Sequence, residues 1–225
     1  LLSLCHARAD RIQLMPRSET APPPLNMAVR LAVFYGGYFL VGGVMFPFWP
    51  LLLEARGLQA GQIGLLLALA LWLRAAAGPF IAWQADRSGA PKKILIACAI
   101  AALAVMPSFY WAAGFWPLLL ATFAFFFAYS SVGPLAETIS LRTVSAEQGY
   151  GRVRLWGSVS FVVAAVAGGF LLDARGDLQA STIVTLLLVT LIILLAASLA
   201  LPRALAANAA RGLAPLKTLL SSKPF

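Results

Sequence analysis

Residues 94–136 read ILIACAIAALAVMPSFYWAAGFWPLLLATFAFFFAYSSVGPLA, and this stretch contains no Asp, Glu, Lys, Arg or His. An α-helix crosses a bilayer with about 20 apolar residues, so the stretch is long enough for two crossings. The rest of the chain is similar: 61% of its 225 residues are hydrophobic and 11% are charged, and its mean hydropathy is +0.86. This composition excludes an ordinary soluble fold and also a disordered chain, which needs low hydrophobicity and high charge.

Apolar segments of similar length recur along the whole chain. A transmembrane β-barrel would show alternating segments of about 10 residues, whereas these segments are longer and continuously apolar. Short loops join them, so consecutive segments should be antiparallel. We therefore predict an all-α membrane protein built as a bundle of six transmembrane helices. The predicted spans are residues 31–53, 61–84, 93–112, 115–140, 153–172 and 181–201.

The formal net charge of +9 fits either nucleic-acid binding or the excess of Lys and Arg on the cytoplasmic side of a membrane protein. The position of the charges decides between the two. Both ends of the chain and the loops after the second and fourth spans hold 14 of the 17 Lys and Arg residues, and the other three loops hold 2. This alternation predicts that both ends are cytoplasmic, and it accounts for the charge without nucleic acid as a partner.

The chain divides into three predicted regions. Residues 1–29 contain Arg8, Arg11, Arg17 and the run Pro22-Pro23-Pro24, and we expect them to form a disordered cytoplasmic tail. No cleavable signal peptide is expected, because no apolar region of the kind that it needs precedes the first span. Residues 30–202 form the six-helix transmembrane domain, and residues 203–225 begin a cytoplasmic central linker. The sequence begins with Leu, so we expect a fragment, with Met15 or Met27 as a possible true start.

The residue types that hold metals or carry out catalysis are scarce. The two cysteines, Cys5 and Cys98, lie far apart, and the single histidine, His6, lies in the predicted tail. Neither a disulfide framework nor a zinc-ligand spacing is present, and no nucleophile lies near a candidate base. We therefore predict that the protein is not an enzyme and has no cofactor and no metal.

Glycines and prolines are concentrated in particular spans. Small side chains let helices approach closely in lipid, so we interpret most of these glycines as packing positions. Pro47, Pro50 and Pro79 are expected to bend their helices. The glycines concerned are Gly36, Gly37, Gly42 and Gly43 in the first span and Gly168 and Gly169 in the fifth.

Arg74 is an ionisable residue inside a predicted span, where a charge is costly. It lies twelve residues before Asp86, which marks the cytoplasmic end of that span, and this separation is about 18 Å along a helix. An arginine side chain does not comfortably reach the interface over that distance. Arg74 is therefore either a cation that lines a central cavity and attracts an anionic substrate, or one member of a buried structural ion pair.

Glu137 and Arg154 lie on neighbouring antiparallel spans, at a similar membrane depth. They can form a carboxylate–guanidinium pair that binds a polar ligand, or a surface salt bridge that closes a loop. Pro134 should free a backbone carbonyl one turn before it. Arg154, Ser158 and Phe161 follow at i, i+4 and i+7, so they share a helix face that is either a binding wall or plain packing.

The loop between the second and third spans contains Asp86-Arg87-x-Gly89-x-x-Lys92-Lys93. Its charges can change partners when helices move, or they can reflect membrane orientation alone. The pattern resembles the major facilitator superfamily signature Gly-x-x-x-Asp-Arg-x-Gly-Arg-Arg/Lys, with Ala82 in place of the first glycine. The six spans resemble the N-terminal half of such a transporter. The resemblance implies a gating loop made of Asp86, Arg87, Gly89, Lys92 and Lys93.

Other elements resemble the phenylpropionate transporter family, whose relatives include lactose permease. The resemblance covers roughly residues 30–225. It rests on Phe46-Pro47-Phe48-Trp49-Pro50, on Gly57-Leu58 followed by Ile63-Gly64-Leu65-Leu66-Leu67, on Arg74, on Pro134-x-x-Glu137, and on Tyr150-Gly151-Arg152-Val153-Arg154-Leu155-Trp156-Gly157-Ser158.

This resemblance implies roles for individual residues. In lactose permease, the residues that match Glu137 and Arg154 form the charge pair that binds sugar, so both are expected to line the substrate site. Phe161 matches a tryptophan that stacks on the sugar ring, and a phenylalanine there suggests a different ring. Arg74 matches an arginine of the phenylpropionate group. The resemblance also implies a C-terminal six-helix half, absent from this chain, that carries most of the proton coupling.

We therefore predict a secondary active transporter that works by alternating access, as a proton symporter for a small organic solute such as an aromatic carboxylate. Its partners would be that solute, a proton and the lipid bilayer of a bacterial inner membrane. The substrate site would comprise Arg74, Glu137, Arg154, Ser158 and Phe161. One alternative is a sugar or nucleoside proton symporter, and another is a membrane assembly factor or receptor that has the same fold but does not transport.

Overall fold

A computed structural model describes residues 25–143, 150–174 and 180–201, and within these ranges the chain is helical, without β-strands. Six segments are long and apolar enough to cross a membrane. The helices are α2 (Leu25–Ala55), α3 (Ala60–Ser88), α4 (Pro91–Val105), α5 (Phe115–Tyr129), α6 (Val132–Thr143), α7 (Tyr150–Asp173) and α8 (Ala180–Ala200), and a short 3₁₀ helix, η1 (Met106–Tyr110), extends α4.

The predicted all-α bundle of six spans is confirmed, and each predicted end agrees with the structure to within six residues. The largest difference is at the start of α2, which begins at Leu25. Backbone hydrogen bonding continues the helix past the apolar stretch, so residues 25–29 of the predicted tail are helical. Residues 1–24 of that tail, and the predicted linker from residue 203, lie outside the described residues.

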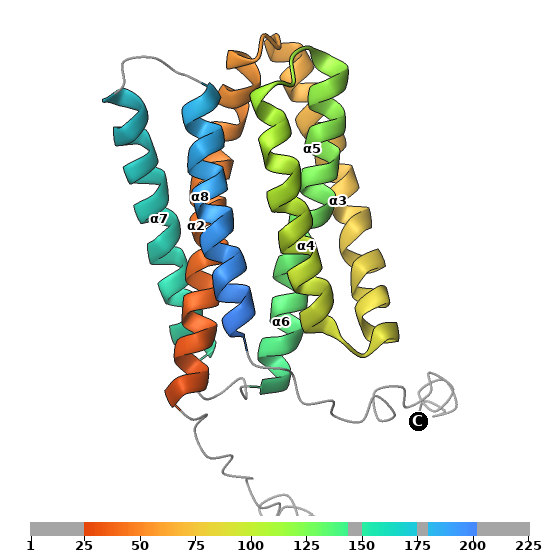
Figure 1. Cartoon of the computed structure of the whole chain (residues 1–225), viewed down its shortest axis with the longest axis vertical. Helices are drawn as coiled ribbons and strands as arrows, with labels where there is room; N and C mark the ends of the chain where they lie inside the picture. The colour runs from red at the N-terminus through yellow and green to blue at the C-terminus, as the bar shows by residue number, and fades with distance from the viewer. Residues whose placement is uncertain (1–24, 144–149, 175–179, 202–225) are drawn as a thin grey trace, which may run out of the picture.

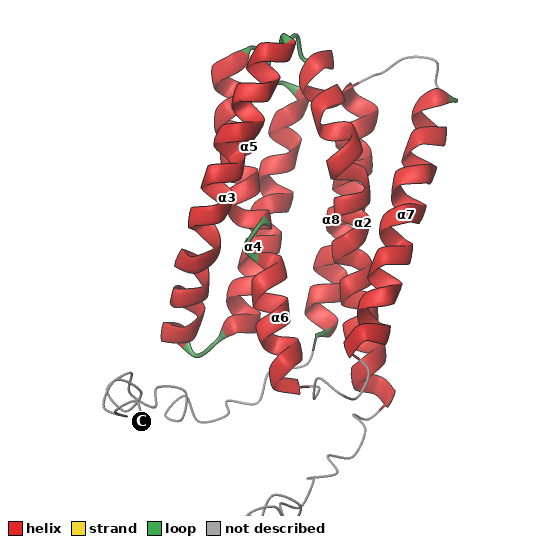
Figure 2. Cartoon of the chain, turned by 180° about the vertical axis from the view of Figure 1, so that it is seen from behind, coloured by secondary structure: helices red, strands yellow, loops and turns green. Residues whose placement is uncertain are grey.

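The helices form two groups that stand side by side. Helices α2, α7 and α8 make one group, and α3, α4, α5 and α6 make the other (Figure 1). The view from behind shows the same division (Figure 2). Helices α4 and α8 pack against each other where the groups meet. Helix α2 begins at the same end of the bundle at which α8 ends, as an even number of crossings requires (Figure 1).

Helices α5 and α6 belong to one membrane span that is interrupted at Ser130 and Ser131. The interruption lies one turn before Pro134, which has no N–H to donate to the Ser130 carbonyl and whose ring crowds that carbonyl. Beside it, the hydroxyl of Ser131 donates to the carbonyl oxygen of Phe127, one turn earlier, at 3.2 Å. The helix thus breaks where the proline was expected to free a backbone carbonyl. Helix α6 lies in the half of the bundle where α2 begins (Figure 1).

Helix α2 approaches α7 most closely at Gly43. A β-carbon at this position would collide with the backbone carbonyl oxygen of Phe161 and would lie 2.8 Å from Cβ of Ala164. Only a residue without a side chain therefore allows the two backbones to meet. The contact supports the interpretation of this glycine as a packing position, and it fixes where α7 presents Phe161.

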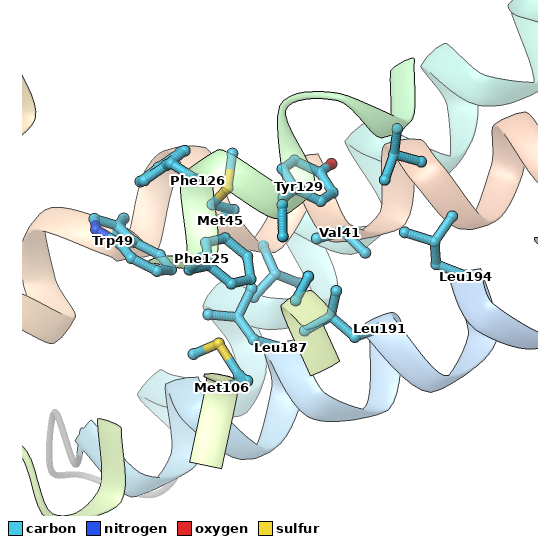
Figure 3. Packing of buried hydrophobic residues seen from close by; sticks show 14 of the residues in the cluster. Val41, Met45, Trp49, Met106, Phe125, Phe126, Tyr129, Leu187, Leu191 and Leu194 are labelled. Atoms are coloured by element: carbon cyan, nitrogen blue, oxygen red, sulfur yellow. The ribbon is translucent and has the colours of Figure 1, made fainter. Parts of the chain in front are cut away.

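An aromatic cluster of the buried core lies toward the end where α2 finishes. Trp49 is its centre, with ring centroids 5.0 Å from Phe125, 5.1 Å from Phe126 and 5.2 Å from Phe109. Met106 and Leu187 pack on the same cluster, from the end of α4 and from α8 (Figure 3). This cluster holds α2 against α5 in the half of the bundle where α2 ends.

Candidate functional site

A cavity of about 320 Å³ lies between the two helix groups. Five helices contribute to its wall, which is why no short sequence motif contains it. The lining residues are Tyr35, Tyr38, Phe39, Gly42 and Phe46 of α2, Arg74 of α3, Tyr129 of α5, Gly133, Pro134 and Glu137 of α6, and Arg154 and Phe161 of α7. We call this space the central cavity.

Arg74 reaches the central cavity from the middle of α3 and is half-buried. Its guanidinium carbon lies 5.8 Å from the ring centroid of Phe46 and 5.5 Å from that of Phe126. Two aromatic faces thus stabilise the cation partly. Among the side chains that the structure describes, no carboxylate lies within 4.0 Å of this guanidinium, so the structure gives no support for a buried structural ion pair at Arg74.

Glu137 and Arg154 face each other across the cavity wall. Their nearest atoms, Oε1 and Nη1, are 3.6 Å apart, and the two side chains are 48% and 53% exposed. The two groups form an ion pair, but the distance between them is too long for a good hydrogen bond. Both groups therefore keep free lone pairs and N–H donors toward the cavity, where a ligand could engage them. The expected meeting of these residues from neighbouring helices is present.

Aromatic rings form most of the remaining wall. Phe161 lies against Phe46 with a centroid distance of 6.2 Å, and Tyr38 stacks on Tyr129 at 5.3 Å. The hydroxyl of Tyr129 donates to the backbone carbonyl of Tyr38 at 3.0 Å, so α2 and α5 are tied together beside the cavity. A β-carbon at Gly133 would lie 2.7 Å from the Tyr38 hydroxyl oxygen, which makes this glycine necessary for the position of the ring.

Sequence reasoning did not identify the aromatic and glycine residues that α2 contributes to this wall. A ring in an apolar span normally packs against other helices, so composition gives no reason to choose it. One signal was available, because Tyr35, Phe39, Gly42 and Phe46 follow at i, i+4, i+7 and i+11 and therefore share one face of α2. That face meets the Arg74 side of the bundle only in the folded protein.

The structure brings four of the five predicted substrate-site residues to the central cavity. Arg74, Glu137, Arg154 and Phe161 line it, whereas Ser158 is exposed and does not belong to the lining set. Ser158 shares a broad helix face with Arg154 and Phe161, but the cavity touches that face only at its two ends. Sharing a face is therefore a weaker condition than sharing a cavity.

The predicted gating loop lies away from the central cavity. Gly89 has a positive φ of 63°, as the tight turn between α3 and α4 requires. The Arg87 guanidinium carbon lies 5.4 Å from the Trp83 ring centroid, and Lys93 is exposed. The side chain of Asp86 lies outside the described part of the chain. These residues hold the turn itself, and the structure shows no contact between them and the cavity wall.

Lys92 links this loop to a distant part of the chain. Its Nζ donates to the carbonyl oxygen of Leu199, at 3.0 Å, and to that of Leu201. The last carbonyls of a helix have no donors within the helix, and a cation there also offsets the negative end of the helix dipole. Lys92 thus caps α8 and ties the start of α4 to the point where α8 ends.

The chain was compared with known proteins. The model of the MFS_1 like family matches residues 28–214. The chain is 34% identical to maltose permease of Geobacillus stearothermophilus over 88% of this chain and 51% of the permease. It is 33% identical to the probable 3-phenylpropionic acid transporter of Escherichia coli over 62% of this chain and 37% of that protein. The uncharacterized transporter YwbF of Bacillus subtilis is 31% identical over 64% and 38%, respectively.

The chain therefore spans about half the length of maltose permease and less of the other two. No solved structure gives a significant match. The resemblance to major facilitator and phenylpropionate transporters, expected from the loop signature and from the elements around Arg74 and Glu137, is confirmed. With six apolar helices and a family model that covers most of its length, this integral membrane protein belongs to the MFS_1 like family of the major facilitator superfamily.

Proposed function

We propose that this chain is the N-terminal half of a secondary transporter for a small organic anion, in particular an aromatic carboxylate. The proposal includes alternating access, coupling to protons, and a bacterial inner membrane with both ends of the chain in the cytoplasm. The observation that carries it is the charge of the central cavity, whose described lining has two guanidinium groups and one carboxylate.

The positive excess can be assigned to a residue. Arg154 and Glu137 lie close enough to compensate each other, whereas the described contacts of the Arg74 guanidinium are with the rings of Phe46 and Phe126. A cation at membrane depth is costly unless it has a partner of opposite charge or contact with water. A ligand carboxylate supplies that partner in a bidentate geometry. An anion therefore fits this cavity better than a neutral solute does.

The walls also favour a ligand that carries a ring. With the carboxylate held by Arg74, the adjoining apolar part of the ligand lies beside the rings of Phe46 and Phe161. Aromatic side chains that pack on a ligand ring add stabilisation beyond the apolar area that is buried. Glu137 and Arg154 then orient a second polar group of the ligand, since both keep donors and acceptors free.

A sugar is the second candidate, and a specific observation supports it. The half-exposed Glu137–Arg154 pair can accept from and donate to neighbouring hydroxyl groups, and maltose permease is the relative that matches the largest part of this chain among those compared. This candidate leaves the charge of Arg74 without a role in substrate binding. We therefore place it second.

The test is uptake by the full-length protein that carries this chain, reconstituted in proteoliposomes. We expect labelled 3-phenylpropionate to accumulate when an inward proton gradient is imposed, and a protonophore to abolish the accumulation. Arg74→Ala should lower uptake about 10- to 100-fold, because a hydrogen bond to a charged group is lost, and Arg74→Lys should keep part of it. Leu69→Ala, on the same helix, serves as the control, since Leu69 lines neither this cavity nor the two neighbouring ones.

The other outcomes separate the rivals. Uptake of maltose without uptake of the acid would establish the sugar candidate. If neither solute is transported and the protein copurifies with a stable partner, the interpretation as an assembly factor or receptor gains support and the transport proposal fails.

A further inference from the structure

A second cavity, of about 230 Å³, adjoins the central cavity. Its wall is formed by α2 between Met45 and Pro50, by α3 between Leu67 and Arg74, and by Phe126 of α5. Along both helices these residues lie nearer to the loop between α2 and α3 than the lining of the central cavity does. We call this space the outer pocket.

The two spaces share two residues, Phe46 and Arg74. The guanidinium of Arg74 lies over the Phe46 ring, so this pair stands at the junction between the spaces. Every other residue of the outer pocket is apolar or is the indole of Trp49. The only ionised group on its wall is therefore the one to which the substrate carboxylate is assigned.

One side of the outer pocket is set by the protein core, whereas Leu71 and Phe46, which are 65% and 55% exposed, form its open side. Met45, Trp49 and Ala70 are 1%, 2% and 2% exposed, so close packing fixes their positions. A third cavity, of about 530 Å³, also shares Phe46 and Arg74, but its wall includes Trp72, which is 77% exposed. The buried side of the outer pocket can select among ligands by shape, whereas no lining residue of the third cavity is buried. The outer pocket is therefore the better specificity element.

We propose that the outer pocket binds an apolar substituent on the carbon that bears the substrate carboxylate. This inference rests on the proposed function, since it takes Arg74 as the carboxylate site. A carboxylate held at the junction places its neighbouring carbon between the aromatic wall of the central cavity and the apolar outer pocket. The aromatic arm of the acid occupies the central cavity, and a second arm enters the outer pocket. The substrate class is thus an aromatic carboxylate that is branched next to the carboxyl group.

The proposal predicts a dependence on the size of that second arm. In the full-length protein, unlabelled 2-methyl-, 2-ethyl- and 2-propyl-3-phenylpropionate should compete with labelled 3-phenylpropionate for uptake. Each added methylene that becomes buried should lower the half-inhibitory concentration about fourfold, which corresponds to about 0.8 kcal/mol. The amide of 2-propyl-3-phenylpropionate should compete poorly, because it lacks the charge that Arg74 binds.

Two substitutions at Leu67, which lines only the outer pocket, should change this dependence in opposite directions. Leu67→Trp fills the pocket and should abolish the advantage of the propyl compound over 3-phenylpropionate. Leu67→Ala enlarges the pocket and should move the best substituent to a longer chain. Leu69→Trp makes the same change at a position on α3 that lines none of the three cavities, and it should leave the series unchanged.

The results distinguish failure of this inference from failure of the proposed function. If 3-phenylpropionate is transported but the branched acids compete no better than it does, the outer pocket has no role in binding and the inference is wrong. The same holds if Leu67→Trp and Leu69→Trp have equal effects. If no carboxylate is transported, the proposed function fails together with the inference. If Leu67→Trp does not fold, Leu67→Ala still tests the inference, because an unchanged best substituent in that variant would contradict it.

Discussion

Helices α2 and α3 follow each other in the chain, have 31 and 29 residues and both contain proline, yet they are placed very differently. In its most apolar window, 56% of the residues of α2 are buried within the bundle, against 24% for α3. Helix α2 packs along both α7 and α8, whereas α3 leaves large side chains such as Leu71 and Phe80 exposed. Helix α2 is thus central to the bundle, and we call it the spine. Helix α3 lies at the edge of the bundle, which we call the margin.

The comparison teaches that apolar character and burial are separate properties in a membrane protein. Lipid is as apolar as a leucine side chain, so an outward-facing leucine loses nothing there, and contact between helices depends on close packing instead. The helix at the margin is also the one that carries Arg74.

The first way to break the comparison is to insert the same side chain into both helices. Gly43→Leu should prevent α2 and α7 from meeting, at a loss of more than about 3 kcal/mol, because the new side chain would collide with the Phe161 carbonyl. Gly64→Leu in α3 should be tolerated, since a β-carbon there meets nothing within 4 Å. Folded yield by size-exclusion chromatography and melting temperature would measure both. Equal behaviour of the two variants would contradict the distinction between spine and margin.

The second prediction concerns Glu137 of α6, whose side chain lines the central cavity together with Arg74 of α3. Glu137→Gln should lower uptake about 10- to 100-fold, because hydrogen bonds to a charged group are lost from the ligand. The melting temperature should fall by less than about 4 °C, since a half-exposed ion pair contributes about 1 kcal/mol or less to stability. Thr138→Ala, at the next position, removes a hydroxyl that donates to the Pro134 carbonyl and is the matched control. A large loss of stability with unchanged uptake would make the pair a structural salt bridge.

The third prediction concerns the loop between α3 and α4, where Lys92 ties the start of α4 to the end of α8. Lys92→Gln should lower the melting temperature by about 2–4 °C, because the last carbonyls of α8 lose a cationic donor worth about 1 kcal/mol. Lys93→Gln removes the same charge from the next residue, which is exposed, and should have almost no effect. If the two variants lose equal stability, net charge matters at this loop and the cap on α8 does not.

The smallest effect is expected at the most exposed part of α3. Trp72→Leu should change the stability of the isolated six-helix chain, once purified in detergent, by no more than about 0.5 kcal/mol, as substitutions outside packed regions do. The same substitution in the full-length protein sharpens the comparison. A clearly larger loss there, measured by melting temperature, would show that another part of the protein packs on this face of α3. An equal, small loss in both would leave the face to lipid.

Much of the site could be predicted from the sequence, for reasons that individual residues show. Arg74, Glu137 and Arg154 stand out because a charge in an apolar span needs a partner, and this rule requires no knowledge of the fold. Pro134 indicated the break between α5 and α6, since a missing N–H acts locally. Tyr38, Tyr129 and Gly133 could not be recognised, because their importance depends on contacts between α2 and the α5–α6 segment, far apart in the chain.

Two expectations needed the structure for their correction or refinement. Ser158 satisfied the helical spacing with Arg154 and Phe161, but the cavity does not extend to it. Lys92 was assigned to gating through a loop motif, and the structure places its ammonium group on the end of α8, more than a hundred residues along the chain. In both cases the local pattern was correct and the neighbouring element decided the contact.

The sequence by itself determined that six helices are long and apolar enough to cross a membrane and which few charges require an explanation. Each of these follows from sums over short stretches, because the transfer of a segment into lipid depends on that segment alone. Only the tertiary structure decided that α2 is the spine, that Arg74 stands between the central cavity and the outer pocket, and that Lys92 caps α8. These depend on how closely particular helices approach, which is set by the shapes of side chains that meet from distant parts of the chain.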